Sequence, residues 1–374
     1  MLKRLEKLGK RGLACAIKPL LPGEPSLSSP PPLSDINNVL VIRHDNKLGN
    51  LLLITPFLGS LRSALPQAEI TLLISEAFPG VFEGNDDINR VVLYHKKNLK
   101  RYPWRSVGLL RELREAGYDL AVDLSHPHSF SFTSALLAVL SGAPYRLGFE
   151  RGDAHHYLNL TASMPGGKLH ESDIFLELLH RLGLDETTGR LRYRVLPPET
   201  TQAGRELEGL GLLGDELLIG IFTGGSGIKK IDHDKLIEIA SKLDARLPGK
   251  VIFFTGPLER GSPNHFEEAS HGSWIVAPQL PLRQFAALLS CVSVLVTPDS
   301  GPMHLASAIG VPIVAIFRED SSWRYGPRDD HDTILLYPNE VDCSEVCKAV
   351  AATLARGAGS STGNSSHEAN TQDN

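Results

Sequence analysis

Short apolar segments recur along the chain and alternate with longer segments in which apolar residues return every three or four positions. The short segments are rich in Val, Ile and Leu at nearly every position, which is typical of parallel strands covered on both faces. In the first half they predict strands over residues 38–44, 69–75, 90–95, 120–125 and 145–149. The longer segments predict helices there over residues 103–117 and 172–184.

The second half of the chain repeats this alternation. Its short segments predict strands over residues 217–223, 250–255, 273–277, 292–297 and 312–317, and residues 232–247 have a helical stripe. Residues 186–205 are polar and Pro-rich without a long helical pattern, so we expect the domains to divide there. Two successive βαβ series predict an α/β protein of two doubly wound, Rossmann-like domains facing a central crevice, where a ligand would bind.

The two ends of the chain differ from the rest. Residues 1–36 combine a basic, Leu-rich segment (1–21) with a Pro/Ser-rich linker, and residues 357–374 have the composition of a disordered tail. Residues 1–21 predict either a basic amphipathic helix on an anionic membrane surface or a solvated extension. The expected domains are therefore residues 37–190 and 206–356.

Composition narrows the classes of function. Hydrophobic residues make up 42% of the 374 residues and charged residues 22%, as in soluble globular proteins. The net charge of -5 gives no basic field, so we expect no nucleic-acid partner. The four scattered cysteines give neither a disulfide framework nor a zinc site, and no apolar run approaches the ~20 residues that span a bilayer. We expect a cytoplasmic protein, with peripheral attachment to an anionic membrane surface depending on residues 1–21.

The segment 292–317 has the most informative motif. A buried strand ends at Pro298, and Asp299-Ser300-Gly301-Pro302 turns into a helix expected to begin near Met303, with His304 in its first turn. Such a turn directs backbone N–H groups and the positive end of the helix at a ligand, which suits a diphosphate. The alternative is that Asp299 or Ser300 simply caps the helix.

Two further strand ends carry residues suited to a nucleotide. Thr223-Gly224-Gly225-Ser226-Gly227 follows a strand and precedes Lys229 and Lys230. Glycines let the backbone approach a ligand and lysines neutralise phosphate oxygens, although a plain turn is the alternative. After the next strand, Gly256 is followed by Glu259, whose carboxylate suits a ribose or is simply exposed.

The first strand ends in a cluster of charged residues. Arg43, His44, Asp45 and Lys47 lie together, and Gly49-Asn50 opens a predicted helix. This cluster indicates a second site, with solvated charge at a loop end as the alternative.

In this order the motifs resemble the bacterial heptosyltransferase family of lipopolysaccharide inner-core assembly, glycosyltransferase family 9, over residues 38–330. The resemblance includes Arg-x-Asp-x-x-x-Gly after the first strand, followed by a helix ending near Thr-Pro, and the Asp-Ser-Gly-Pro-Met-His turn. It implies the two-domain GT-B fold and inverting transfer of a heptose from a nucleotide-sugar, typically ADP-heptose, to a lipid-linked glycan acceptor. No metal and no cofactor are implied.

The resemblance also implies roles for individual residues. The acceptor side, in the N-terminal domain, would comprise Arg43, Lys47, Asp123 and His126. The donor site, in the C-terminal domain, would comprise Thr223, Gly224, Gly225, Ser226, Lys229, Lys230, Gly256, Glu259, Asp299, Ser300, Gly301, Pro302, Met303 and His304. Within it, Ser226 and Lys230 would hold the donor's phosphates or sugar, with Lys229 in reserve.

One departure from the family concerns the proton acceptor. The family has an aspartate, its presumed general base, where this chain has Asn50, and an amide is not a useful base. Asp45 is the nearest substitute, and His44 is a weaker one. The family's Trp-Pro after the lysines is also replaced, by Ile231-Asp232. The alternatives are a catalytically impaired homologue serving as a binding or scaffold subunit, and a sugar-nucleotide epimerase, for which no acid/base pair stands out.

Overall fold

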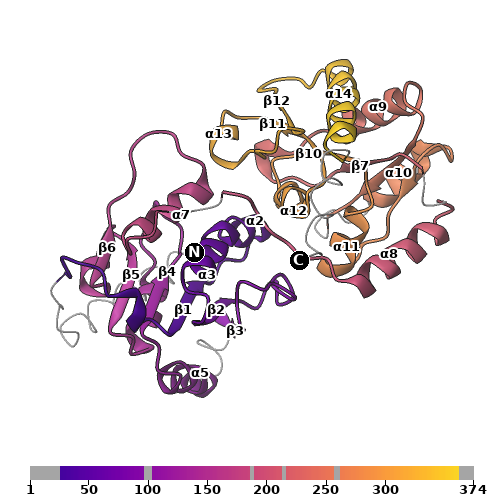
Figure 1. Ribbon diagram of the computed structural model, residues 1–374. Helices are drawn as coiled ribbons and strands as arrows, with labels where there is room; N and C mark the ends of the chain where they lie inside the picture. The colour runs from indigo at the N-terminus through magenta and orange to yellow at the C-terminus, as the bar shows by residue number, and fades with distance from the viewer. Residues whose placement is uncertain (1–25, 97–102, 186–188, 213–215, 257–261, 362–374) are drawn as a thin grey trace, which may run out of the picture. The chain divides into compact units, whose positions relative to one another are not determined.

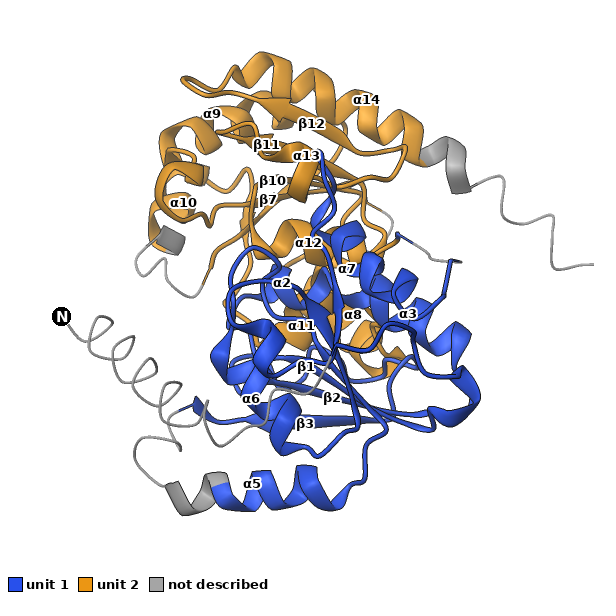
Figure 2. Ribbon diagram, turned by 90° about the vertical axis from the view of Figure 1, so that its left-hand side faces the viewer, with its two compact units in different colours: residues 1–189 blue, residues 190–374 orange. Residues whose placement is uncertain are grey.

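The computed structural model describes residues 26–96, 103–185, 189–212, 216–256 and 262–361. The chain divides into two compact units, Met1–Gly189 and Arg190–Asn374 (Figure 2). Each unit contains a six-stranded sheet with helices on both faces (Figure 1). The predicted membrane-binding segment 1–21 and residue Glu259 lie outside the described residues.

In the first unit all neighbouring strands are parallel, in the order β3-β2-β1-β4-β5-β6. The central strand β1 is buried along nearly its whole length, and Val41 lies opposite Leu72 of β2 and Val122 of β4. The order reverses between β1 and β4, and α/β sheets bind ligands at such a point, beyond the carboxyl ends of the strands. The strands are β1 (Asn38–Arg43), β2 (Glu69–Ser75), β3 (Arg90–Tyr94), β4 (Leu120–Asp123), β5 (Tyr145–Phe149) and β6 (Leu160–Ala162).

Helices cover both faces of this sheet. Leu40 and Ile42 pack in one apolar cluster with residues of α5 (Pro103–Glu115) and α6 (Phe132–Leu140). On the other face α3 (Thr55–Ala64) packs against α7 (Glu171–His180), whose Phe175 contacts Phe149 of β5. The remaining helical elements are α2 (Leu48–Leu52), η2 (Leu33–Asp35) and η3 (Ala154–His156).

The second unit repeats the arrangement. Its sheet has the order β12-β11-β10-β7-β8-β9, again wholly parallel, so β7 and β10 are neighbours where the order reverses. This is the same topology as in the first unit, because β7 takes the place of β1 and β10 that of β4. The strands are β7 (Leu218–Phe222), β8 (Lys250–Phe254), β9 (Ile275–Val276), β10 (Val294–Pro298), β11 (Ile313–Phe317) and β12 (Thr333–Leu336).

The helices of the second unit form two layers. An apolar cluster joins one face of the sheet to α9 (His233–Asp244), α10 (Ser262–Ser270) and α14 (Cys343–Ser361). On the other face α11 (Leu282–Leu289) packs against α8 (Pro197–Gly209) and α12 (Gly301–Ile309). The short elements η4 (Gly227–Lys229) and α13 (Ser322–Tyr325) follow β7 and β11. No helix among the described residues is long and apolar enough to span a bilayer.

The structure corrects two expectations, on residues 186–205 and on the predicted tail. Residues 186–205 were expected to lack a long helix, yet α8 begins at Pro197. Glu199 stabilises its first turn by accepting the Leu196 N–H at 2.8 Å. The helix expected at Gly49-Asn50 is present as α2, which ends at Leu52, close to Thr55-Pro56 as predicted. The next helix, α3, begins at Thr55 with a proline in its first turn, where a missing N–H costs nothing. Finally α14 continues to Ser361, into the predicted tail.

Candidate functional sites

In the second unit two loops converge at the carboxyl edge of the sheet. Residues 223–230 follow β7, residues 299–302 follow β10, and these strands are parallel neighbours. The Lys229 ammonium lies 2.5 Å from Oδ2 of Asp299 and so joins the two loops. The two segments that the sequence assigns to the donor site therefore lie together in the fold.

The loop after β7 depends on its glycines. Thr223 is buried, and its N–H donates to the Phe254 carbonyl at 3.0 Å. A Cβ on Gly225 would lie 2.9 Å from Cα of Lys230, so only glycine lets the chain fold back here. Gly227 has a φ of +59°, in the left-handed region that glycine adopts without strain. Ser226 and Gly227 are exposed, which leaves the tip of the loop open to a ligand.

The turn after β10 is not a simple helix cap. The helix α12 begins at Gly301, two residues before the predicted start, with Pro302 in its first turn. Ser300 occupies the N-cap position but its side chain accepts no hydrogen bond from the helix; its Oγ lies 3.1 Å from Oγ1 of Thr297. The capping alternative therefore fails for Ser300, and the positive end of α12 faces the edge where an anion can bind.

Charge and burial differ sharply among the residues of this edge. The Asp299 side chain is 7% exposed and that of Lys229 is 30% exposed. The Lys229 ammonium also lies 3.9 Å from Oε1 of Glu319 and 5.7 Å from the ring centre of Tyr325. Burial lowers the pKa of His304 from 6.5 to about 4, although the nearby carboxylate of Asp299 acts to raise it. His304 is therefore neutral at pH 7 and offers a ligand hydrogen bonds rather than charge.

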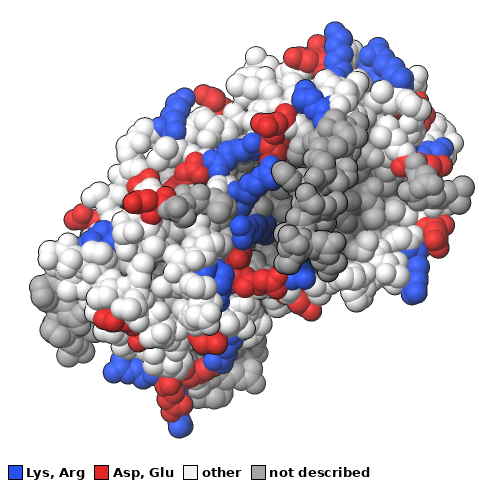
Figure 3. Space-filling model, viewed as in Figure 1, with Lys and Arg blue, Asp and Glu red and all other residues white. Residues whose placement is uncertain are grey.

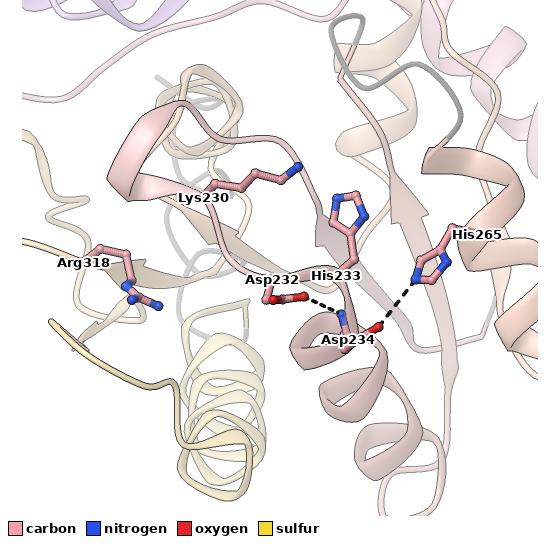
Figure 4. Close-up of a pocket in the computed structure, with 6 residues that line it drawn as sticks. All are labelled: Lys230, Asp232, His233, Asp234, His265 and Arg318. Carbon is pink, nitrogen blue, oxygen red and sulfur yellow. Dashed lines mark hydrogen bonds and ion pairs between the residues drawn. The ribbon is translucent and has the colours of Figure 1, made fainter.

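Lys230 lies apart from this ion pair. It lines a pocket of about 610 Å³ together with Asp232, His233, Asp234, His265 and Arg318 (Figure 4). Asp232 caps α9 by accepting the N–H of Asp234, whose carboxylate lies 3.6 Å from Nε2 of His265. The adjacent lysines therefore have different surroundings. The lysine that contacts Asp299 is Lys229, whereas the sequence analysis favoured Lys230 for the donor.

The other predicted donor-site residues take varied positions. Met303 is fully buried in the core. Gly256 is buried, and its carbonyl accepts a hydrogen bond from the Gln279 amide at 3.0 Å. Gly301 and Pro302 form the first turn of α12.

In the first unit the corresponding edge holds a buried arginine. Arg43 is 1% exposed at the end of β1, and its guanidinium donates to the Leu124 carbonyl and lies 3.5 Å from Oδ2 of Asp45. Its Cζ atom is 5.1 Å from the ring centre of Phe175. Burial lowers the pKa of Arg43, and the carboxylates of Asp45, Glu171 and Asp123 oppose that shift.

Asp45 is the partly open member of this cluster. Its side chain is 23% exposed. Its Oδ1 accepts the backbone N–H of Lys47 at 3.0 Å, and its Oδ2 accepts Nδ2 of Asn50 at 2.7 Å. His44 turns elsewhere, with Nε2 3.3 Å from Oγ of Ser131. The structure therefore brings Arg43, Asp45 and Asn50 together.

The neighbouring strand β4 adds a second buried pair. Asp123 is 1% exposed and its Oδ2 accepts Nη2 of Arg151 at 3.1 Å. Burial lowers the pKa of Arg151. Sequence reasoning missed Arg151, although it stands two residues after the strand at 145–149, where site residues are expected. His126 follows β4, and its Nδ1 accepts the N–H of His128 at 3.3 Å.

A carboxylate and histidine cluster lies at the opposite edge of the second sheet. One ligand atom from each of Asp329, His331 and Asp332 lies within 4.8 Å of the others. Asp332 already accepts the N–H groups of Ile313 and Asp329, at 3.0 and 3.1 Å, at the amino ends of the strands. This cluster stabilises the loop before β12 and does not reach the Lys229–Asp299 pair.

Comparison with known proteins identifies the family. The model of "Glycosyltransferase family 9 (heptosyltransferase)" matches residues 107–351, more than half of the chain. The chain belongs to glycosyltransferase family 9. It is 25% identical over 283 residues to lipopolysaccharide heptosyltransferase 3 of Escherichia coli, covering 72% of this chain and 80% of that protein.

Solved structures agree with the family and the fold. The family 9 glycosyltransferase from Veillonella parvula superposes with a TM-score of 0.76 at 25% identity, covering 86% of this chain and 98% of that one. E. coli ADP-heptose lipopolysaccharide heptosyltransferase II gives a TM-score of 0.70 at 20% identity, covering 85% of this chain and 99% of that one. E. coli heptosyltransferase WaaC with ADP gives a TM-score of 0.69 at 16% identity, covering 84% of this chain and 99% of that one. The predicted GT-B fold is confirmed, and the chain is an enzyme of the glycosyltransferase class.

Proposed function

We propose that this glycosyltransferase moves a heptose, or a close analogue, from an ADP-sugar to a lipid-linked acceptor of the lipopolysaccharide core. The observation that carries the proposal is the Lys229–Asp299 contact, which joins two ligand-facing loops at the edge where α/β sheets bind nucleotides. E. coli heptosyltransferase WaaC, which has the same fold, has been solved with ADP and with ADP-2-deoxy-2-fluoro heptose. Acidic and basic side chains both occur over the face shown in Figure 3.

The donor would bind in the second unit. The N-terminus of α12, at Ser300 and Gly301, and the ammonium of Lys229 would stabilise the departing diphosphate without a metal ion. Asp299 would accept hydrogen bonds from sugar hydroxyls, and His304 would bind as a neutral group. Ser226 and Lys230 would contact phosphate or sugar, and Glu259 the nucleoside.

The acceptor would bind in the first unit. Arg43, Lys47 and His126 would lie on its side, where a phosphorylated lipid sugar needs positive partners. Asp45 would take the proton of the acceptor hydroxyl. As that proton leaves, the acceptor oxygen forms its bond to the anomeric carbon from the face opposite the ADP, the carbon–diphosphate bond breaks, and the configuration inverts.

A thermal-shift experiment tests the donor assignment without knowledge of the acceptor. ADP or an ADP-sugar at 100 times its Kd should stabilise the protein by about 2.7 kcal/mol, because it binds only the folded chain. Asp299→Ala should abolish the shift produced by the ADP-sugar. If neither ADP nor any nucleotide-sugar shifts the melting temperature, the proposal fails.

We also propose that residues 1–21 attach the enzyme to the cytoplasmic face of the inner membrane, where a lipid-linked acceptor would lie. The support is the basic, Leu-rich sequence of this segment. Sedimentation with anionic vesicles should fall when residues 1–21 are deleted. Equal sedimentation of the full and shortened chains would rule the attachment out.

A further inference from the structure

Asn50 stands where the family is expected to carry its general base, and its amide makes a specific contact. Its Nδ2 donates to Oδ2 of Asp45 at 2.7 Å, the shortest of the three hydrogen bonds that this carboxylate accepts among the described residues. We infer that Asn50 is a positioning residue that fixes the Asp45 carboxylate so that its Oδ1 accepts the acceptor's proton. This inference rests on the proposed transfer reaction.

The hydrogen bonds of Asp45 show which oxygen is open. A carboxylate has about four acceptor positions, two on each oxygen. Oδ2 faces two donors, Nδ2 of Asn50 and Nη2 of Arg43 at 3.5 Å. Oδ1 accepts only the backbone N–H of Lys47 among the described residues. One position on Oδ1 thus stays open, on a side chain that is 23% exposed.

The partners of Asp45 are themselves held in place. Arg43 is 1% exposed and is fixed by the Leu124 carbonyl and the Phe175 ring. Asn50 lies within α2, next to the buried Gly49. A base held by such partners keeps one orientation toward its proton, and a misplacement of about 1 Å can cost about 10²-fold in rate.

The competing interpretation is that Asn50 is a decayed base with no present role. Restoring aspartate would then restore or raise activity. The geometry predicts the reverse, because a carboxylate at position 50 would face Oδ2 of Asp45 at hydrogen-bond distance. Two carboxylates that share a site repel each other when both are charged, so the pair would keep a proton to higher pH than Asp45 does beside Asn50.

The first test is steady-state kinetics of the full chain with an ADP-heptose donor and a lipopolysaccharide-core acceptor. Asn50→Leu removes the N–H at similar size and should lower kcat about 10²-fold while acceptor KM and ADP affinity stay unchanged. Asn50→Gln, which keeps an amide N–H, should recover part of that loss. The matched control is Asn46→Leu in the same loop, whose amide meets Ser75 and not Asp45; it should keep the kcat of the unmodified enzyme.

The second test exchanges the two side chains. In Asn50→Asp the acidic limb of the kcat–pH profile should move to higher pH, since the new carboxylate would face that of Asp45 and repel it. The charged groups around their neighbour Arg43, which are Asp45, Glu171, Asp123 and Arg151, stay as they are. The double variant Asp45→Asn with Asn50→Asp should be as inactive as Asp45→Asn alone. Activity in the double variant, or an unchanged kcat in Asn50→Leu, overturns the inference while leaving the transfer reaction intact. An unmodified enzyme that binds ADP in calorimetry but transfers no heptose overturns both.

Discussion

The two units share one sheet topology but use its carboxyl edge differently. In the first unit a buried cation, Arg43 at 1% exposure, lies against the partly open carboxylate of Asp45. In the second unit the burial is reversed: Asp299 is 7% exposed and its cation, Lys229, is 30% exposed. The first arrangement fixes a carboxylate that can accept a proton, and the second holds a cation that can turn to a phosphate. In the proposed reaction, the same scaffold would support base catalysis in one unit and anion binding in the other.

The largest expected effect comes from removing the open carboxylate of the first unit. Asp45→Asn should lower kcat by about 10²–10⁴-fold, the usual contribution of a general base. ADP affinity, measured by calorimetry, should not change, because the proposed donor residues lie in the other unit. A kcat close to that of the unmodified enzyme would show that the proton goes elsewhere, with His44 the next residue to test.

Burial of His304 predicts a pH dependence that belongs to the second unit. Its folded pKa of about 4 lies below the ordinary 6.5, so the unfolded chain binds the proton more tightly. The contribution of His304 to the free energy of unfolding is fully present above pH 6.5. It is lost as the pH falls to 4 and below, and the total loss is about 3 kcal/mol. Chemical unfolding of the protein and of His304→Gln at pH 7 and pH 4 measures the difference. Parallel losses in both proteins would contradict the prediction.

The adjacent residues Lys229 and Lys230 allow a test of which ammonium group binds the phosphates of ADP. Lys229→Met should weaken ADP binding about 10- to 100-fold, because a hydrogen bond to a charged group contributes about 1.5–3 kcal/mol. Lys230→Met is the matched variant and should cost less, since Lys230 lines the separate pocket. Calorimetric titration with ADP decides, and a larger loss at Lys230 would assign the phosphate to that pocket.

The smallest effect concerns the backbone of the loop after β7. Gly225→Ala should destabilise the second unit by about 1–3 kcal/mol and weaken ADP binding, because its Cβ would press on the Lys230 backbone. Gly108→Ala in α5 is the control, since a Cβ there meets nothing within 4 Å. Thermal unfolding with and without ADP measures both. Equal behaviour of the two variants would mean that the loop can yield.

Much of the fold was predictable because its signals are local. Ten of the described strands coincide with short segments rich in Val, Ile, Leu or Phe, most of them buried, and such segments can be recognised without knowledge of their neighbours. The strands β6 and β12 escaped prediction, since β6 has three residues and β12 is half exposed. The helix α8 was not predicted, because its first residues have the composition of a loop. An ion pair between Glu199 and Arg283, 84 residues away in the chain, stabilises its start.

The sequence by itself determined the family and the strand ends where the candidate site residues lie. Glycines, turns and buried strands can be recognised from neighbouring residues alone. Only the tertiary structure decided which side chains meet. It selected Lys229 over Lys230 as the partner of Asp299, brought Arg151 to Asp123, and turned the amide of Asn50 onto Asp45. Those choices depend on strand order and on the direction of each side chain, and neither property is local in the chain.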